Sequence, residues 1–236
     1  MGVILVVLSL LLLTYIAASV PIGVIVTTLY GGQVDIRSAG SGNIGATNVA
    51  RVTSWRLAIP VLVIDVAKGL VPVLLAPLFW SGSPDGELAL KVAVAAAAFG
   101  GHCFSLFLSF RGGKGVATGA GAMAGIAPLP TLLAALTWVG VLLVTKRSSV
   151  AALLSTALML VYTWWLTPEL TYVVLALAMG IAFRHATNIR RMMKGEEPTV
   201  VPPVHWGETH KPSVAQLLQQ RPDGRPTKTP LEPDRD

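Results

Sequence analysis

The chain has 236 residues, of which 53% are hydrophobic and 13% are charged, and its mean hydropathy is +0.66. Soluble domains carry about 25% charged residues, so this composition excludes an ordinary soluble domain and predicts an integral membrane protein. The single cysteine, Cys103, excludes an internal disulfide framework and a multi-cysteine metal site. The formal net charge of +6 lies entirely within residues 1–197. Basic residues that face the cytoplasm explain it without nucleic-acid binding.

Apolar segments divide the chain into seven expected membrane-spanning helices and define an all-α fold, because a span needs about 20 mostly apolar residues. The expected spans are residues 3–29, 57–80, 90–109, 115–127, 130–145, 149–166 and 170–184. The first has no basic residues before its apolar run, so it is interpreted as an uncleaved span and not as a secretory signal. The uncharged run 115–145 exceeds one ordinary span, and Pro128 and Pro130 divide it into two.

The distribution of charge predicts the orientation of these spans. With the amino terminus outside, the inner segments carry the basic residues Arg37, Arg51, Arg56, Arg111, Lys114, Lys146, Arg147, Arg184, Arg190, Arg191 and Lys194. The outer turns carry Asp85, Glu87 and Glu169 against a single basic residue, Lys91. This pattern obeys the positive-inside rule, which a single crossing over 115–145 would break. We therefore expect a multi-pass protein of the plasma (inner) membrane with its carboxyl terminus in the cytoplasm.

Two regions are expected along the chain. Residues 1–197 form one integral-membrane domain, whereas residues 198–236 contain eight prolines and little apolar sequence. The composition of this cytoplasmic tail is typical of a disordered segment, and we assign no chemistry to it.

Three polar stretches lie where apolar spans end, and they carry the functional signal. They cover residues 41–51, 101–118 and 184–197, and are called here the first, second and third polar stretches. Each combines basic residues with small hydroxyl or amide side chains, and the first two also contain clustered glycines. Because such groups hold phosphate, we expect an enzyme that acts on phosphorylated molecules at the cytoplasmic face of the membrane.

The first polar stretch overlaps the sequence GSGNIG at residues 40–45. This sequence matches the dinucleotide fingerprint G-x-G-x-x-G, but it follows a membrane span instead of a β-strand, which argues against a dinucleotide. Its glycines allow several backbone N–H groups to face one anion. Ser41, Asn43 and Asn48 add side-chain donors, and Arg51 adds a planar guanidinium that matches phosphate. A flexible loop with one cytoplasmic arginine is the alternative interpretation.

The second polar stretch contains RGGKG at residues 111–115, which invites comparison with a nucleotide-binding P-loop. The comparison fails because Leu108 stands at the first glycine position, and Gly115 follows the lysine in place of serine or threonine. A close approach of the backbone to phosphate, with Lys114 as a point charge, remains as the expectation. The alternative is a basic loop that contacts anionic lipid.

The third polar stretch holds the strongest candidate among the histidines, His185, which basic residues and Asn188 surround. If this stretch is helical, Asn188, three residues later, lies on the same face as His185. Glu197 is assigned a structural role. Asp65 and Lys68, three residues apart in the second span, are interpreted as a structural ion pair.

Several catalytic motifs are absent from the sequence, and we expect neither a metal nor a cofactor. No histidine is followed by four residues and an aspartate, as in a common class of glycerolipid acyltransferases, and neither G-x-S-x-G nor H-E-x-x-H occurs. A transporter for an anionic solute is the main rival, but the basic residues gather on one side and no inverted repeat is evident. A scaffolding protein would leave the three polar stretches unexplained.

Taken together, the three stretches resemble the signature motifs of the bacterial acyl-phosphate:glycerol-3-phosphate acyltransferase family (PlsY). The resemblance rests on SGNIGATNVAR, GHCFSLFLSFRGGKGVAT and RHATNIRRMMKGEE, with DIRSAGSGN before the first and DVAKG in the second span, and it covers most of residues 15–197. Ser105 stands where the family usually has proline, and Met192 where it usually has leucine. The family transfers a fatty acyl group from acyl-phosphate to the 1-hydroxyl of glycerol 3-phosphate, which is the first acylation of phospholipid synthesis.

The resemblance implies partners and roles for the site residues. The implied partners are acyl-phosphate, glycerol 3-phosphate, the lipid bilayer and neighbouring phospholipid-synthesis enzymes. Ser41 and Arg51 would help to hold a phosphate, while His185 and Asn188 would orient the attacking hydroxyl or the carbonyl. The expected substrate-binding residues are Gly112, Gly113, Lys114 and Gly115 for glycerol 3-phosphate, with Ser149, Asn43 and Asn48 as further contacts.

Overall fold

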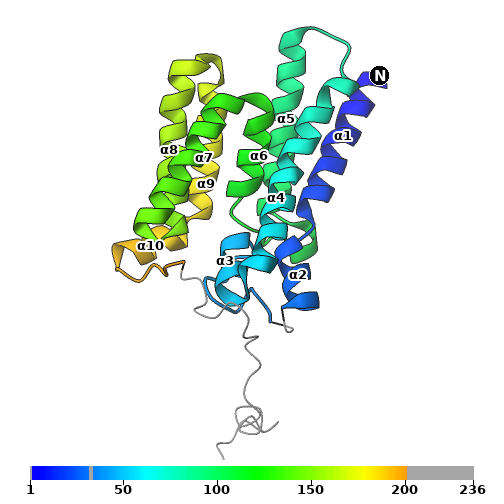
Figure 1. Ribbon diagram of the computed structural model, residues 1–236. Coiled ribbons are helices and arrows are strands. Elements are labelled where there is room, and N and C mark those ends of the chain that lie inside the picture. Colours follow the sequence, from blue (N-terminus) through cyan, green and yellow to red (C-terminus); the bar gives the residue numbers. More distant parts are fainter. Residues whose placement is uncertain (1, 32–33, 201–236) are drawn as a thin grey trace, which may run out of the picture. The chain divides into compact units, whose positions relative to one another are not determined.

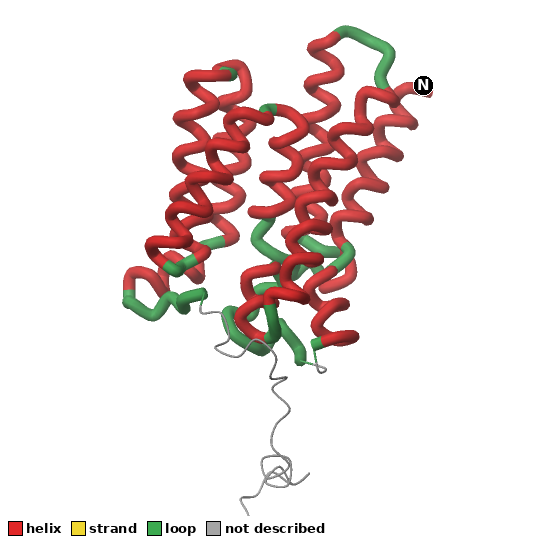
Figure 2. The backbone as a smooth tube through the Cα atoms, in the orientation of Figure 1, coloured by secondary structure: helices red, strands yellow, loops and turns green. Residues whose placement is uncertain are grey.

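The computed structural model describes residues 2–31 and 34–200, and every regular element in this part of the chain is helical, which confirms the predicted all-α class (Figure 2). The helices are α1 (Gly2–Ser19), α2 (Ile22–Tyr30), α3 (Ala46–Val52), α4 (Trp55–Leu75), α5 (Pro84–Cys103), α6 (Val116–Ile126), α7 (Pro128–Thr145), α8 (Ser148–Leu166), α9 (Thr171–Arg184) and α10 (Ala186–Met193) (Figure 1). Short 3₁₀ turns cover Ala76–Phe79, Leu106–Leu108 and Pro168–Leu170. Residues 201–236, most of the predicted tail, lie outside the described residues.

The helices have the length and hydropathy of an integral membrane protein. Five segments of the described chain can each span a membrane: Gly2–Tyr30, Trp55–Phe79, Pro84–Leu108, Pro128–Thr145 and Ser148–Leu166. A sixth combines Pro168–Arg184 with α10, between which the chain bends by 62°. All seven predicted spans coincide with helices, but α6 has only 11 residues, shorter than the roughly 20 that a full crossing needs. Seven crossings and their orientation therefore stay predictions.

The first span is broken between α1 and α2 at a proline, which has no N–H to donate to the preceding turn. Two carbonyls at this break accept hydrogen bonds from the Ser105 hydroxyl and the Lys68 ammonium. Lys68 also pairs with Asp65, 3.0 Å away, and both side chains are buried. The pair is therefore structural, and it ties α4 to the break in the first span.

The short helix α6 lies inside the bundle because glycines let it approach α4 closely (Figure 1). A Cβ built on Gly121 would lie 2.0 Å from the carbonyl oxygen of Val66, and one on Gly69 would lie 2.0 Å from that of Thr118. Small residues four apart permit such approaches between membrane helices, as the sequence predicts for α6. The contact fixes the helix that begins directly after the second polar stretch.

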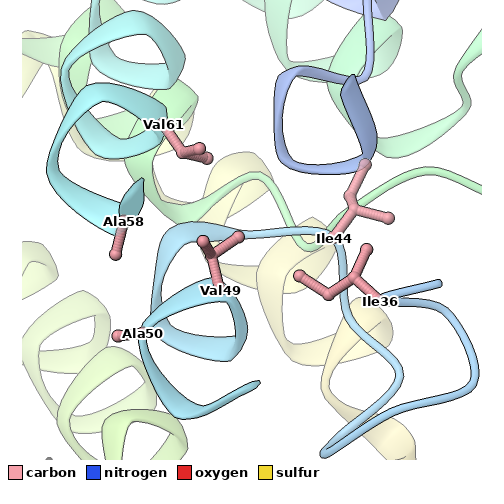
Figure 3. Packing of buried hydrophobic residues seen from close by; sticks show 6 residues of the cluster. All are labelled: Ile36, Ile44, Val49, Ala50, Ala58 and Val61. Carbon is pink, nitrogen blue, oxygen red and sulfur yellow. The ribbon is translucent and has the colours of Figure 1, made fainter. Parts of the chain in front are cut away.

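A cluster of buried apolar side chains holds α3 and the first polar stretch against α4. It comprises Ile36, Ile44, Val49, Ala50, Ala58 and Val61 (Figure 3). Val49 of α3 and Val61 of α4 are completely buried, and Ile36 from the loop before α3 is buried with them. This packing fixes the first polar stretch relative to the helices that carry the rest of the site.

Candidate active site

The three polar stretches come together at the end of the bundle opposite the amino terminus, where α2, α3 and α10 also lie (Figure 1). A cavity of about 170 Å³ lies between them. Its lining comprises Ser41, Gly42, Asn43, Gly112, Lys114, Arg184, Thr187, Asn188 and Arg191. Three of these residues are basic and none is acidic, so the cavity attracts anions.

The cavity brings together part of the predicted site. Five predicted residues line it, namely Ser41, Asn43, Gly112, Lys114 and Asn188. The other six do not line it, namely Asn48, Arg51, Gly113, Gly115, Ser149 and His185. Four further residues line the cavity that were not predicted as site residues, namely Gly42, Arg184, Thr187 and Arg191. Arg184 ends α9 whereas Asn188 and Arg191 lie in α10, beyond a bend of 62°, so no single helical face in the sequence groups these three residues.

Asn48 organises the first polar stretch from the inside. Its Oδ1 accepts from the Ser41 N–H, 2.8 Å away, and from Arg51 Nη1, 3.1 Å away. Its Nδ2 donates to three backbone carbonyls of the same loop at 2.9–3.2 Å, and its side chain is 1% exposed. Every polar atom of this amide is therefore engaged within the loop. The structure makes Asn48 a scaffold for the loop, where the sequence predicted a substrate contact.

Arg51 does not line the cavity, but it contacts the first polar stretch and the chain just after the third. Besides Asn48, its guanidinium contacts the carbonyl of Thr199, 3.3 Å from Nε. Burial lowers the pKa of Arg51, and Glu197 partly opposes this shift. A half-buried cation of this kind gains from a nearby anion, so the position is compatible with phosphate although Arg51 does not line the cavity.

The N–H groups of Gly112 and Gly113, expected to approach a phosphate, are engaged within the protein. The Gly112 N–H donates to the Cys103 carbonyl at 3.1 Å, and the Gly113 N–H donates to the His102 carbonyl at 2.9 Å. Both N–H groups are therefore bonded back to the end of α5. Gly115 precedes α6 with φ of +77°, a left-handed conformation that glycine adopts without strain. These glycines shape the loop, and Lys114 supplies its charge.

Lys114 is the central cation of the cavity. Burial lowers its pKa to about 8, Glu197 raises it, and the like charges of Arg191 and Arg51 lower it further. An anion bound in the cavity would offset both the burial and the repulsion. Lys114 is thus poised to hold a phosphate group.

His185 sits at the junction of α9 and α10, where the chain bends by 62°. Its side chain is 1% exposed, and burial, together with the charge of Lys114, lowers its pKa to about 4. The ring is therefore neutral at physiological pH. Nδ1 lies 2.8 Å from the Ile181 carbonyl, which can only accept, so Nδ1 carries the proton and Nε2 is left as an acceptor.

Asn188 and Glu197 form a buried pair next to His185. Asn188 Nδ2 donates to Glu197 Oε1 at 2.6 Å, and Arg191 Nε donates to Glu197 Oε2 at 3.0 Å. Burial raises the pKa of Glu197, but the hydrogen bonds from Asn188 and Arg191 help to hold the pKa below its usual value. Asn188 Oδ1, in contrast, is buried without a partner among the described residues. Glu197 thereby orients Asn188 and leaves one amide acceptor for a ligand.

Residues 197–200 return across the other stretches. Arg147 Nε donates to the Glu197 carbonyl at 3.2 Å, and the Val200 N–H donates to the Lys146 carbonyl at 2.6 Å. Val200 is 7% exposed. Packed structure therefore extends to Val200, three residues beyond the predicted end of the membrane domain. Over residues 2–31 and 34–200, no three His, Cys, Asp or Glu side chains group as a metal site would.

These features define a class: an integral membrane protein with a cationic site for anions at one end of its helix bundle. A family model described as "Glycerol-3-phosphate acyltransferase" matches residues 8–195. The chain belongs to this family. It is therefore an acyltransferase, and the rival interpretations as a transporter or a scaffold do not hold.

Relatives and solved structures agree with this assignment. The glycerol-3-phosphate acyltransferase of Anaeromyxobacter dehalogenans is 45% identical over 189 residues, which are 79% of this chain and 93% of the relative. That of Agrobacterium fabrum is 42% identical over 190 residues, 80% of this chain and 89% of the relative. The crystal structure of PlsY (YgiH), an integral membrane glycerol 3-phosphate acyltransferase, in its glycerol 3-phosphate form matches with a TM-score of 0.74 and 29% identity, over 82% of this chain and 94% of that one. Its lysophosphatidic acid form matches with a TM-score of 0.72, 28% identity and the same coverage.

Proposed function

We propose that this chain transfers a fatty acyl group from acyl-phosphate to the 1-hydroxyl of glycerol 3-phosphate, giving lysophosphatidic acid and phosphate. The observation that carries the proposal is the cavity lined by Lys114, Arg184 and Arg191 without an acidic residue. The two forms of the solved PlsY structure, with glycerol 3-phosphate and with lysophosphatidic acid, support this acceptor and this product. The choice of acyl-phosphate as donor rests on the resemblance of the three polar stretches to the family motifs.

The proposed location is the plasma (inner) membrane, with the site facing the cytoplasm. All three polar stretches carry the basic residues that favour the cytoplasmic side. At that surface the site is open to water-soluble glycerol 3-phosphate and to a donor whose acyl chain stays in the bilayer. The proposed partners are these two substrates, the bilayer and neighbouring enzymes of phospholipid synthesis.

The proposed reaction needs orientation and charge stabilisation more than a strong base, because the mixed anhydride is already activated. The oxygen of the 1-hydroxyl forms a bond to the acyl carbon, and the bond from that carbon to the bridging phosphate oxygen breaks. The hydroxyl proton passes to an oxygen of the departing phosphate. Asn188 Oδ1 and His185 Nε2 are the acceptors that can orient the hydroxyl. Ser41 and Arg51 are assigned to phosphate.

Substitutions of the two principal cations test these roles. Lys114→Ala should raise the KM for glycerol 3-phosphate by about 10- to 100-fold, the usual size of a lost charge-assisted contact of about 1.5–3 kcal/mol. Arg51→Ala should reduce turnover strongly in folded, purified protein. Lys194→Ala, which removes an exposed lysine of the third stretch, serves as the control. Wild-type kinetics in both site variants would remove these residues from the proposed site.

A further inference from the structure

Gly112 and Gly113, called here the glycine loop, are bonded to α5 on one side. Their N–H groups donate to the carbonyls of Cys103 and His102. A Cβ on Gly112 would lie 2.1 Å from the His102 carbonyl oxygen, and a Cβ on Gly113 would lie 2.2 Å from His102 Nε2. The loop therefore rests directly on His102, and only glycine fits at either position.

His102 is itself held in place on the side away from the loop. Its Nδ1 lies 3.7 Å from Asp65 Oδ1, and both side chains are buried. Asp65 is paired in turn with Lys68. The surface on which the glycine loop rests is thus backed by a buried polar cluster of α4 and α5.

Arg184 holds the opposite side of the glycine loop. Its Nε donates to the Gly113 carbonyl at 3.0 Å, and its Nη2 donates to the Gly112 carbonyl at 2.7 Å. The guanidinium carbon also lies 5.4 Å from the centre of the Phe104 ring. The last residue of α9 thus donates hydrogen bonds to two consecutive carbonyls of a loop that lies about 70 residues earlier in the chain.

We propose that Arg184 is a positioning residue, which acts through the carbonyls of Gly112 and Gly113 and thereby sets Lys114 for the acceptor phosphate. The proposal rests on the proposed function. A planar guanidinium can donate to two carbonyls at once, whereas a lysine ammonium is a single point charge. The two hydrogen bonds, and not the positive charge alone, are therefore the essential property of Arg184. The glycine loop contributes shape and no phosphate ligand from its two engaged N–H groups.

The test measures glycerol 3-phosphate binding to purified protein by calorimetry, and KM and kcat with acyl-phosphate as donor. Arg184→Lys keeps the charge and loses the two-pronged contact. We expect its Kd and KM for glycerol 3-phosphate to rise at least about tenfold, with kcat and the KM for the donor within about threefold of wild type. The matched control is Arg190→Lys, at an exposed arginine of α10, which should leave all these values unchanged.

A second variant tests the route of the effect. Gly113→Ala disturbs the same loop from the His102 side, so its Kd for glycerol 3-phosphate should also rise. Because both changes act on one loop, the Kd of the double variant for glycerol 3-phosphate should be no higher than the higher of the two single-variant values. Elution as a single species in gel filtration checks that each variant is folded.

Three results would overturn the proposal. Arg184→Lys with Kd and KM within about twofold of wild type would show that charge alone suffices. A fall in kcat with an unchanged KM would make Arg184 a transition-state contact. Multiplied effects in the double variant would show that Arg184 and Gly113 act independently. Failure of the proposed function looks different, because wild-type protein would then bind or acylate no glycerol 3-phosphate at all.

Discussion

Lys114 shows how burial prepares a side chain for an anionic ligand. It lines the cavity together with Arg184 and Arg191, and burial lowers its pKa to about 8. At neutral pH Lys114 is therefore protonated although burial disfavours its charge, and a bound phosphate would reduce this unfavourable free energy. The same balance makes binding sensitive to pH in a range where few other side chains titrate.

The KM for glycerol 3-phosphate should therefore rise as the pH rises through about 8. A lysine whose pKa is lowered loses its proton above that value, and the phosphate then loses its counter-charge. From a pKa of about 8, the protonated fraction in free enzyme falls about tenfold between pH 7 and pH 9. The phosphate, with a second pKa of about 6, stays a dianion throughout this window.

Initial rates across this range measure the effect, with Lys114→Arg as the matched variant. Arginine stays protonated, so the variant should show a flatter KM between pH 7 and pH 9. A KM for the wild type that does not change over this range would contradict the assigned role of Lys114.

Sequence alone identifies which residue types could hold phosphate, but not which of their atoms remain available. Asn48 carries a suitable amide, yet five hydrogen bonds engage it inside its own loop. Gly112 and Gly113 permit a close approach of the backbone to phosphate, yet their N–H groups bond to α5. Arg184 is visibly basic, but its contact with two distant carbonyls depends on tertiary packing. Such partners are chosen by the fold and leave no local pattern.

At the scale of elements, the close contact between α4 and α6 fixes the position of α6, and with it the second polar stretch. α6 is short, and an isolated helix of 11 residues is marginal without tertiary packing. Gly69 and Gly121 provide that packing by removing side chains where the two backbones meet. The second polar stretch is attached to the start of α6, so this contact also supports Lys114.

Gly121→Ala should destabilise the protein although alanine favours helices. The added Cβ would lie 2.0 Å from the Val66 carbonyl oxygen, and overpacking of this kind costs about 1–3 kcal/mol. Gly140→Ala is the matched control, because a Cβ on Gly140 meets nothing within 4 Å. Thermal unfolding in detergent should show a lower Tm for Gly121→Ala only. Equal Tm values for the two variants would contradict the packing argument.

The long apolar helices were predictable because a membrane-spanning helix needs a continuous run of about 20 apolar residues. Each predicted span coincides with helical structure. The break at Pro21 and the short helices α3 and α10 were not predicted. α3 has 7 residues and α10 has 8, and helices of this length depend on packing more than on propensity. The break at Pro21 does not show in the hydropathy, because the residues on both sides of it are apolar. It arises because proline has no backbone N–H to donate.

At the scale of the whole molecule, the proposed function requires all three polar stretches to lie on one side of the membrane. Figure 1 shows the cavity-forming segments at one end of the bundle, and the turn between α6 and α7 at the other end. The positive-inside rule predicts that the former end faces the cytoplasm. An even number of crossings is then required between the first and the third polar stretches.

Labelling of engineered cysteines tests this orientation. Native Cys103 is buried, so the background is low. Leu129→Cys, at a 52% exposed position at the start of α7, should react with a membrane-impermeant maleimide added to intact cells. Glu196→Cys, at an exposed position of the third polar stretch, should react only after the cells are permeabilised. Labelling of both from the same side would contradict the crossing by α6.

The proposed reaction joins the acyl group of an acyl-phosphate to glycerol 3-phosphate at this site. The most direct measurement incubates purified wild-type protein with labelled glycerol 3-phosphate and either acyl-phosphate or acyl-CoA, and follows product and released phosphate. We expect lysophosphatidic acid and an equal amount of phosphate with acyl-phosphate, and no product with acyl-CoA. Product formation from acyl-CoA, or none from acyl-phosphate, would contradict the proposed reaction.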